Sequence, residues 1–267
     1  MRVVSLLYHD VVTSGDFESS GFPGGDAAIY KLDLSEFERH LNAIQPVISR
    51  PVTVHELPHL HGRSTLLTFD DGGSSAHAYI ADLLESLGWR AHFFVTTDWI
   101  GQRGFLSSAQ IRELRSRGHL IGSHSCSHPP RMSYCNRKEL FQEWNDSVGV
   151  LSDILGEQID LGSVPGGYYA RHVAGCAAEA GIRTLFTSEP RISSQVVNGC
   201  IVLGRFTIRQ KVPPATVAAI AAGKVAPRFS QFAYWNMKKI AKTAGGTSWL
   251  RMRKWLLAKD FLKRLGD

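Results

Sequence analysis

The chain has 267 residues, of which 43% are hydrophobic and 20% charged, and its formal net charge is +6. These values are ordinary for a soluble globular protein and allow one α/β domain with a large core. There is no run of about 18 apolar residues, so the sequence predicts no membrane-spanning helix.

The N-terminus and the cysteines indicate the compartment. The first residues enter a strand pattern at once, and their apolar stretch is too short for the core of a signal peptide. The four cysteines, Cys126, Cys135, Cys176 and Cys200, have no CxxC spacing. They are therefore interpreted as unpaired thiols of a reducing compartment, and we expect a cytoplasmic protein.

The positive charge is concentrated at the C-terminus, where residues 228–267 contain ten Lys and Arg against two Asp. We divide the chain into a main domain, 1–227, and a basic helical extension, 228–267, that contains Trp235, Trp249 and Trp255. Basic residues with tryptophans suit peripheral contact with an anionic membrane, here the inner membrane face. The alternative is a tail helix that packs on the domain with a solvated basic face. No nucleic-acid-binding motif accompanies the charge, so nucleic acid is not an expected partner.

Short apolar runs alternate with amphipathic patterns along the main domain. Strands are predicted at 3–8, 66–69, 91–95, 119–121, 159–163 and 183–187, and helices at 32–44, 78–87, 109–117, 137–155, 171–180 and 215–222. This alternation predicts a parallel sheet or barrel, and periodicity does not distinguish the two. Residues 11–30 are rich in Gly and Ser and predict a loop over the strand ends, where long loops are often functional.

The first chemical motif is Thr68-Phe69-Asp70-Asp71-Gly72, which follows an apolar strand. Because successive side chains of a strand alternate between its faces, the two carboxylates cannot both continue the strand in one orientation. The glycines allow a sharp turn there, which delivers two acids to the C-terminal end of a strand, where α/β folds build active sites. In isolation, such a sequence favours an Asx-type turn with solvated acids, and the second motif reverses that interpretation.

The second motif, His124-Ser125-Cys126-Ser127-His128-Pro129, also follows a strand. If His124 and His128 occupy one helical turn, their i, i+4 spacing puts them on one face, where they could hold a metal. A carboxylate as third ligand completes the donor set of a catalytic zinc site with an open position. A structural role is the alternative for this spacing alone.

Together these motifs resemble those of the polysaccharide deacetylase family, over about residues 1–205. The resemblance implies a distorted (β/α) barrel of about seven strands, and removal of an N-acetyl group from a sugar. It also implies Asp70 as general base, Asp71, His124 and His128 as ligands of a divalent metal, with Zn²⁺ expected, and the Gly166 N–H as a donor to the oxyanion. An N-acetylated glycan of a bacterial surface polysaccharide, or its lipid-linked precursor, is the expected substrate.

The chain departs from the family pattern at three places. Ser163 stands where the third motif, Ser163-Val164-Pro165-Gly166-Gly167, should begin with arginine, which should leave Asp70 less rigidly held and its pKa less depressed. The fourth motif is not found, and Glu189 or Arg191 is the candidate substitute. In the fifth motif Arg205 replaces the histidine that should supply the general acid, and arginine cannot donate a proton usefully at neutral pH.

These departures leave the general acid open. We assign it to His9, which also leaves the C-terminal end of a strand, and a histidine that only supports the core edge is the alternative. Pro165, Tyr168 and Arg205 are expected to contact substrate. Two other functions remain: a catalytically silent protein that binds glycan, and a hydrolase of a non-sugar amide.

Overall fold

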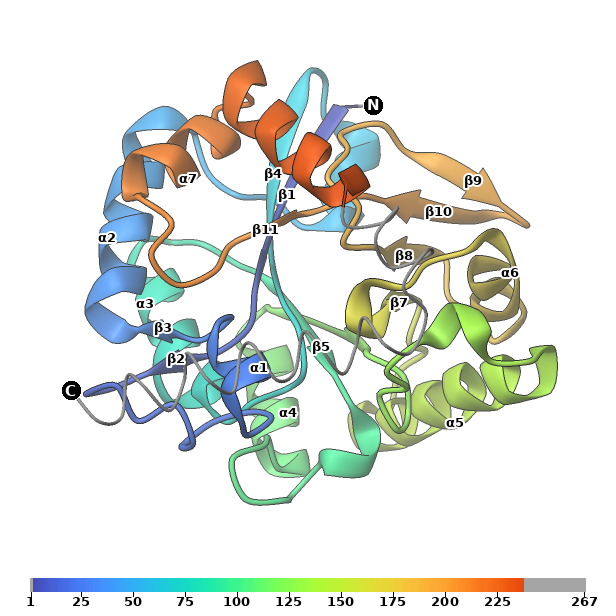
Figure 1. The fold of residues 1–267 in the computed structure, drawn as a ribbon. Helices are drawn as coiled ribbons and strands as arrows, with labels where there is room; N and C mark the ends of the chain where they lie inside the picture. The colour runs from blue at the N-terminus through green and yellow to red at the C-terminus, as the bar shows by residue number, and fades with distance from the viewer. Residues whose placement is uncertain (1, 238–267) are drawn as a thin grey trace.

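The computed structural model describes residues 2–237, and its centre is a curled sheet of nine strands (Figure 1). The strands are β1 (Arg2–Tyr8), β4 (Arg63–Phe69), β5 (His92–Val95), β6 (Leu120–Ser123), β7 (Leu161–Ser163), β8 (Thr184–Phe186), β9 (Gln195–Val197), β10 (Cys200–Leu203) and β11 (Phe206–Thr207). Their order across the sheet is β11-β1-β4-β5-β6-β7-β8-β10-β9. Neighbours run parallel except at the β9–β10 edge.

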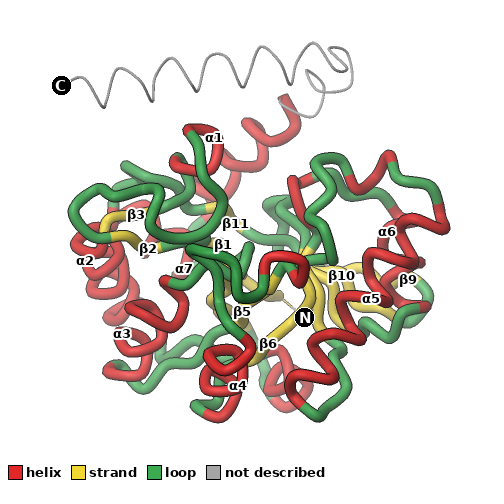
Figure 2. The backbone as a smooth tube through the Cα atoms, turned by 90° about the horizontal axis from the view of Figure 1, so that it is seen from below, coloured by secondary structure: helices red, strands yellow, loops and turns green. Residues whose placement is uncertain are grey.

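Helices surround this sheet, as the alternating pattern predicts. They are α1 (Gly25–Ala28), α2 (Leu34–Ile44), α3 (Ala81–Ser86), α4 (Ser108–Ser116), α5 (Arg137–Leu155), α6 (Arg171–Glu179) and α7 (Pro214–Ala221). Figure 2 shows α2 to α6 around the outside of the strands, while α1 lies apart from them at one end of the sheet. The fold is a distorted (β/α) barrel, as the resemblance implies, and β9, β10 and β11 add to the six strands that were expected.

Local sequence signals explain where the helices begin and end. Ser107 and Gln110 form a reciprocal capping box at the start of α4, and Asn136 and Glu139 do the same at α5. Gly156 ends α5 in a left-handed conformation, with φ 68°. The helix expected at 78–87 is in two parts, because a wide π-helical turn at Ala76–Ile80 precedes α3.

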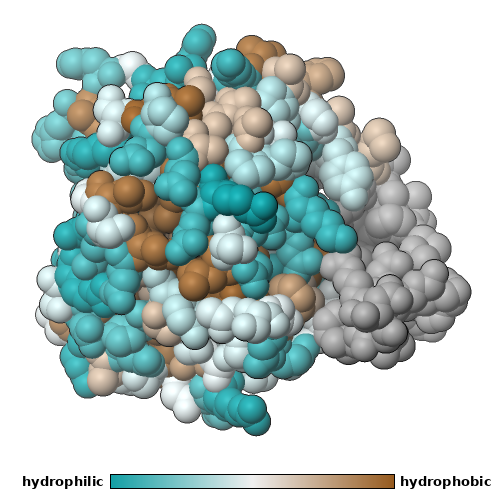
Figure 3. All heavy atoms as spheres, turned by 90° about the vertical axis from the view of Figure 1, so that its left-hand side faces the viewer, coloured by the Kyte–Doolittle hydropathy of each residue, from teal (hydrophilic) through white to brown (hydrophobic). Residues whose placement is uncertain are grey.

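The central strands, β1 and β4 to β8, are largely buried on both faces, which explains why their sequences read as continuous apolar runs. Val3 to Tyr8 of β1 are all at most 3% exposed. His119, before β6, is buried and bonds Glu85 and the Ala91 N–H, which is a structural role. Polar side chains cover most of the side that Figure 3 shows, and apolar side chains gather there in separate clusters.

The loop expected at 11–30 crosses the C-terminal ends of the strands. It contains β2 (Val11–Val12), which pairs with β3 (Leu32–Asp33), and then α1. Asp10 anchors this loop, since its Oδ1 accepts hydrogen bonds from the hydroxyls of Ser20 and Ser75, at 2.6 and 2.7 Å. The loop is thereby fixed against the turn that follows the first motif.

The C-terminal extension is described only in part. Residues 225–237 are helical, so this segment runs across the domain boundary expected at 227/228. The rest of the extension, with Trp249, Trp255 and most of the basic residues behind the expected membrane contact, lies outside the described residues. Within residues 2–237, no helix is both long and apolar enough to cross a bilayer.

Candidate active site

The turn after β4 brings Asp70 and Asp71 into one pocket. Asp70 still pairs with β1, since its N–H donates to the Tyr8 carbonyl at 3.1 Å. Asp71 has φ 76°, a left-handed conformation that non-glycine residues rarely adopt, and Gly72 follows with φ 82°. This reversal breaks the alternation of the strand, so both carboxylates line the pocket.

The two histidines of the second motif lie in a loop after β6. The expectation of a helical turn is wrong, because Ser125 and His128 both have positive φ, 65° and 61°. Short polar bonds hold the loop instead. The Ser125 N–H donates to the Ser123 hydroxyl, and the His128 N–H to the Ser125 hydroxyl, each at 3.1 Å. The Glu143 carboxylate of α5 accepts from the N–H groups of residues 126 and 127.

Asp71, His124 and His128 form a group that can hold a divalent cation. Their ligand atoms all lie within 4.8 Å of one another. Oδ1 of Asp71 is 3.4 Å from Nε2 of His124 and 3.6 Å from Nε2 of His128. Two ligands of a tetrahedral zinc ion are about 3.3 Å apart, so these side chains need little movement to share one.

The surroundings of the histidines favour cation binding. Nδ1 of His124 lies 2.9 Å from the Ser163 carbonyl, and a proton donated there leaves Nε2 free for a metal. Burial lowers the pKa of His128 to about 4, so its imidazole is neutral, as a ligand must be. Burial also acts to lower the pKa of His124, but the carboxylates of Asp70 and Asp71 raise it above its usual value. The same negative charges would attract a cation.

Asp70 is held by Arg205, which corrects two expectations. The guanidinium donates to both carboxylate oxygens at 2.7 Å, and the Ser163 hydroxyl donates to Oδ2 at 3.0 Å. Burial acts to raise the pKa of Asp70, but the charges of Arg205 and His124 lower it below its usual value. Asp70 is therefore firmly held and its pKa is depressed, contrary to both expectations. Arg205 takes the place of the arginine expected at position 163 and reaches the carboxylate from another strand end.

This arrangement also excludes Arg205 from direct substrate contact. Its side chain is fully buried and does not line the pocket. The guanidinium also donates to the Ser163 hydroxyl at 2.6 Å and to the Thr187 carbonyl at 3.2 Å. Serine at position 163 leaves room for the two-pronged contact between Arg205 and Asp70, because its side chain is small and offers a hydroxyl rather than a second cation.

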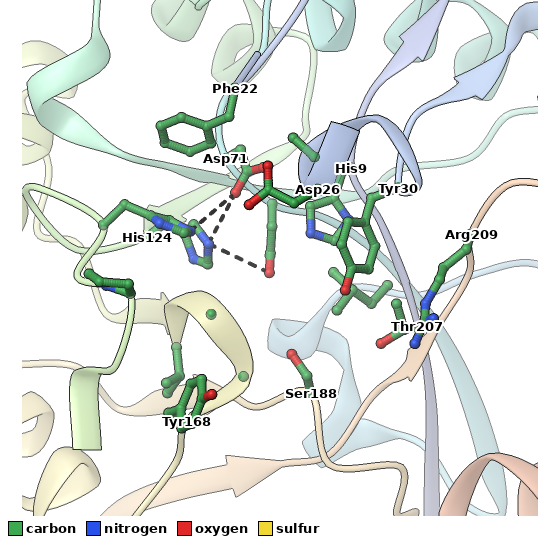
Figure 4. Close-up of a pocket in the computed structure, with 18 of the residues that line it drawn as sticks. His9, Phe22, Asp26, Tyr30, Asp71, His124, Tyr168, Ser188, Thr207 and Arg209 are labelled. Carbon is green, nitrogen blue, oxygen red and sulfur yellow. Dashed lines mark ion pairs between the residues drawn. The ribbon is translucent and has the colours of Figure 1, made fainter. Parts of the chain in front are cut away.

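The pocket encloses about 1060 Å³ and joins these groups to residues from distant parts of the chain (Figure 4). His9, Gly166 and Tyr168 line it as expected, whereas Pro165 is buried and does not line it. The His9 ring packs on Tyr30 with centroids 4.8 Å apart, and its Nδ1 has no hydrogen-bond partner among the described residues. Gly166 has φ 65°, and a Cβ there would lie 2.9 Å from the Pro130 carbonyl oxygen.

Glu189 and Arg191, the candidates for the fourth motif, pair with each other. Neither lines the pocket, although Ser188 and Pro190 beside them do. The fourth motif therefore has no counterpart among the pocket residues at this position.

The opposite wall of the pocket was not predicted from the sequence. Arg209 follows β11, and Gln231, Tyr234 and Trp235 belong to the 225–237 segment. A Cβ at Gly167 would lie 3.1 Å from the Trp235 indole, so Trp235 covers the third motif rather than projecting from a separate tail. Residues 231, 234 and 235 share one face of a helix, and this spacing could have indicated that the helix packs against the domain. The basic charge of the extension drew attention to a membrane contact instead.

Comparison with known proteins relates the central part of the chain to one family. The family model described as polysaccharide deacetylase matches residues 58–185. A chitin deacetylase of Colletotrichum lindemuthianum is 38% identical over 64 residues, which are 24% of this chain and 26% of that protein. YxkH of Bacillus subtilis, which is named as a polysaccharide deacetylase, is 26% identical over 133 residues, 50% of this chain and 47% of that protein. The chain thus spans half or less of these relatives' lengths.

Solved structures share the fold over a larger part of the chain. A de-N-acetylase from Aggregatibacter actinomycetemcomitans superposes with a TM-score of 0.69 at 17% identity, covering 82% of this chain and all of that one. The deacetylase PplD of Streptococcus pyogenes gives 0.67 at 19% identity, covering 80% of this chain and 95% of that one. With both strand-end motifs in place, residues 58–185 of this chain form a polysaccharide deacetylase domain.

Proposed function

We propose that this protein is a metal-dependent hydrolase that removes an N-acetyl group from an amino sugar of a bacterial surface polysaccharide or its lipid-linked precursor. The observation that carries the proposal is the placement of Asp70. A carboxylate held by Arg205 lies next to three residues that can ligate a metal, with His124 Nε2 3.8 Å from its Oδ2, and all four line one pocket. Relatives named as deacetylases support the same reaction.

The donor set suits Zn²⁺, since two imidazoles and a carboxylate leave a fourth tetrahedral position. When bound, such a cation supplies Lewis-acid polarisation of an acyl oxygen and of water. Asp71, His124 and His128 would hold it, and the bond from His124 to the Ser163 carbonyl would orient one ligand.

Asp70 serves as the base. Its lowered pKa keeps it ionised at neutral pH, so a carboxylate oxygen is available to accept the proton of the attacking water. Arg205 fixes both oxygens, which orients the base and stabilises its charge before the reaction and limits its motion. Gly166, on the third-motif side of the pocket, offers its N–H to the oxygen on which negative charge develops.

His9 is the group assigned to protonate the leaving amine. It lines the pocket with Asp70 and Asp71, and its packing on Tyr30 fixes the ring. Asp70 itself, after it has accepted a proton, is the other possible donor. The two are distinguished by the His9 variant described in the Discussion.

Peripheral attachment to an anionic inner membrane face, through the basic extension, belongs to the same proposal, because a lipid-linked glycan is presented there. Flotation with anionic liposomes tests it, with the full chain compared against one that ends near Pro227. Equal flotation of the two would contradict it.

The reaction is tested by metal content and by acetate release from N-acetylated chito-oligomers, for wild type and Asp70→Asn. Asp153→Asn is the matched control, because Asp153 is exposed on α5, away from the pocket. We expect about one zinc per chain in all three proteins, and acetate release abolished only in Asp70→Asn. Bound metal without acetate from any protein would favour a non-sugar amide or a silent glycan-binding role. Absence of metal would contradict the proposal.

A further inference from the structure

Arg209, four residues after Arg205, lines the pocket on the side away from His124 (Figure 4). Its guanidinium carbon lies 5.5 Å from the ring centre of Tyr30 and 5.8 Å from that of Tyr234. Tyr30 packs in turn on His9. The Tyr30 ring therefore lies between the Arg209 guanidinium and His9, which shares the pocket with Asp71. A substrate bound at the metal ligands can extend along this wall to Arg209.

The two arginines differ in what their donors contact. Arg205 directs its donors at Asp70, whereas no Asp or Glu among residues 2–237 forms an ion pair with Arg209. Stacking on aromatic rings uses the faces of a guanidinium, and its N–H donors lie in the plane. Tyr30 and Tyr234 thus position a partly buried cation and leave its donor edge for a ligand.

The neighbouring polar groups fit an anion better than a cation. Figure 4 shows the Thr207 hydroxyl beside the guanidinium, and Asp26 on the His9 side of Tyr30. The amide of Gln231 donates to the Thr207 carbonyl at 3.1 Å, which attaches the 225–237 segment to this wall. Asp26 opposes a negative ligand near His9, so the anionic group is placed at the Arg209 end.

We propose that Arg209 binds an oxyanion of the substrate, so that the enzyme selects an N-acetylated sugar with a phosphate or carboxylate close to the acetamido group. The inference names the substrate class of the proposed deacetylase and rests on that function. A guanidinium fork matches both kinds of oxyanion. The phosphate would belong to the linkage between a sugar and its lipid carrier, and the carboxylate to an acidic sugar within a polymer.

Affinity is measured first, by calorimetry on the full-length, zinc-loaded chain. The probes are chitotetraose, a hyaluronan tetrasaccharide, and N-acetylglucosamine joined to a short alkyl chain by pyrophosphate, each with methanesulfonyl in place of acetyl so that nothing is hydrolysed. The proteins are wild type, Arg209→Met, Arg209→Lys and Arg112→Met. The last is the control, since Arg112 is exposed on α4 and its loss changes net charge equally.

We expect one anionic probe to bind wild type at least about tenfold more tightly than the neutral probe, because charge-assisted hydrogen bonds have that strength. The preferred probe identifies the phosphate or the carboxylate. Arg209→Met should remove the preference, because it weakens binding of the anionic probe far more than binding of the neutral probe. Arg209→Lys should retain part of the preference, and Arg112→Met all of it. A preference equal in wild type and Arg209→Met would place the anion elsewhere, including at the metal, and would overturn the proposal. So would the absence of any preference.

Acetate release from the N-acetyl forms separates this inference from the proposed function. Release from neutral chitotetraose without an anion preference would sustain the deacetylase and overturn the role of Arg209. An anion preference that depends on Arg209, without acetate from any probe, would sustain the anion site and contradict the deacetylase.

Discussion

One wall of the pocket is formed by the ends of β4 and β6, and the opposite wall by the residues after β11 and by the 225–237 segment. The first wall carries Asp70, Asp71, His124 and His128, each within five residues of a strand end. The second carries Arg209, Tyr234 and Trp235, which contact residues far away in the chain, such as Tyr30 and Gly167. The first wall has the groups to which we assign the reaction, and the second has groups suited to binding.

Arg205 connects the two walls. It follows β10 and reaches Asp70 at the end of β4, 135 positions earlier in the chain. The base is therefore completed by a residue from the less recognisable side of the site. If the first wall carries out the reaction and the second binds substrate, variants at the first should lower kcat, and variants at the second should change substrate affinity.

His124→Ala should have the largest effect. It removes one of three possible ligands and the one bonded to the Ser163 carbonyl, so bound metal should fall well below one per chain. We expect acetate release to fall about 10³-fold or more, because the metal supplies several kcal/mol of charge stabilisation. Metal analysis of the purified protein checks this. His172→Ala, on α6 and exposed, is the control, and full metal occupancy in His124→Ala would contradict the ligand assignment.

Arg205→Met should come next. Removing the guanidinium leaves Asp70 buried without its cation, which should cost about 3–5 kcal/mol in the free energy of unfolding. The pKa of Asp70 should rise, and because the base acts when ionised, the acidic limb of the pH–rate profile should move to higher pH. Urea unfolding and the pH dependence of kcat/KM measure the two effects.

Arg205→Lys sharpens this test. It keeps a positive charge but loses the two-pronged contact, so we expect a smaller shift of the acidic limb than in Arg205→Met. An unmoved limb in Arg205→Met, in a folded protein, would show that Arg205 does not control the base.

His9→Ala should have an intermediate effect if His9 protonates the leaving amine. Loss of one general acid typically lowers kcat by about 10²-fold or more, and the metal content should not change because His9 is not in the ligand group. Substrates with a better leaving amine should be affected less. Full activity in the variant would leave Asp70 as the proton donor.

The sequence predicted the first wall well because its information is local. Asp70 and Asp71 follow a recognisable apolar strand, and His124 and His128 follow another, so strand ends that lie side by side bring them together. The left-handed conformation at Asp71, and the loop that replaced the expected helical turn at His124, needed the structure. Both depend on contacts outside the motif, such as Glu143 on the loop.

The contacts of Arg205 and the second wall could not be predicted, because the information for both is not local. Ser163 alone indicates a missing cation, and Arg205 alone a missing proton donor. Only the structure shows that the two substitutions compensate each other, since one carboxylate contacts both residues. Trp235 was assigned to a membrane-facing tail by charge and aromatic content, which carry no information about what a helix packs against.

Trp235→Ala should have the smallest effect and tests the second wall most directly. The indole lies over Gly167 and closes the pocket from the 225–237 segment, away from the metal ligands. Its loss should raise KM about five- to tenfold, as the removal of one aromatic contact to substrate does, with kcat changed less than about twofold. Trp235→Phe retains the aromatic surface and should recover most of the affinity. If kcat and metal content fall with KM instead, the 225–237 segment supports the metal-ligand wall through the third motif, and the separation between a reacting wall and a binding wall does not hold.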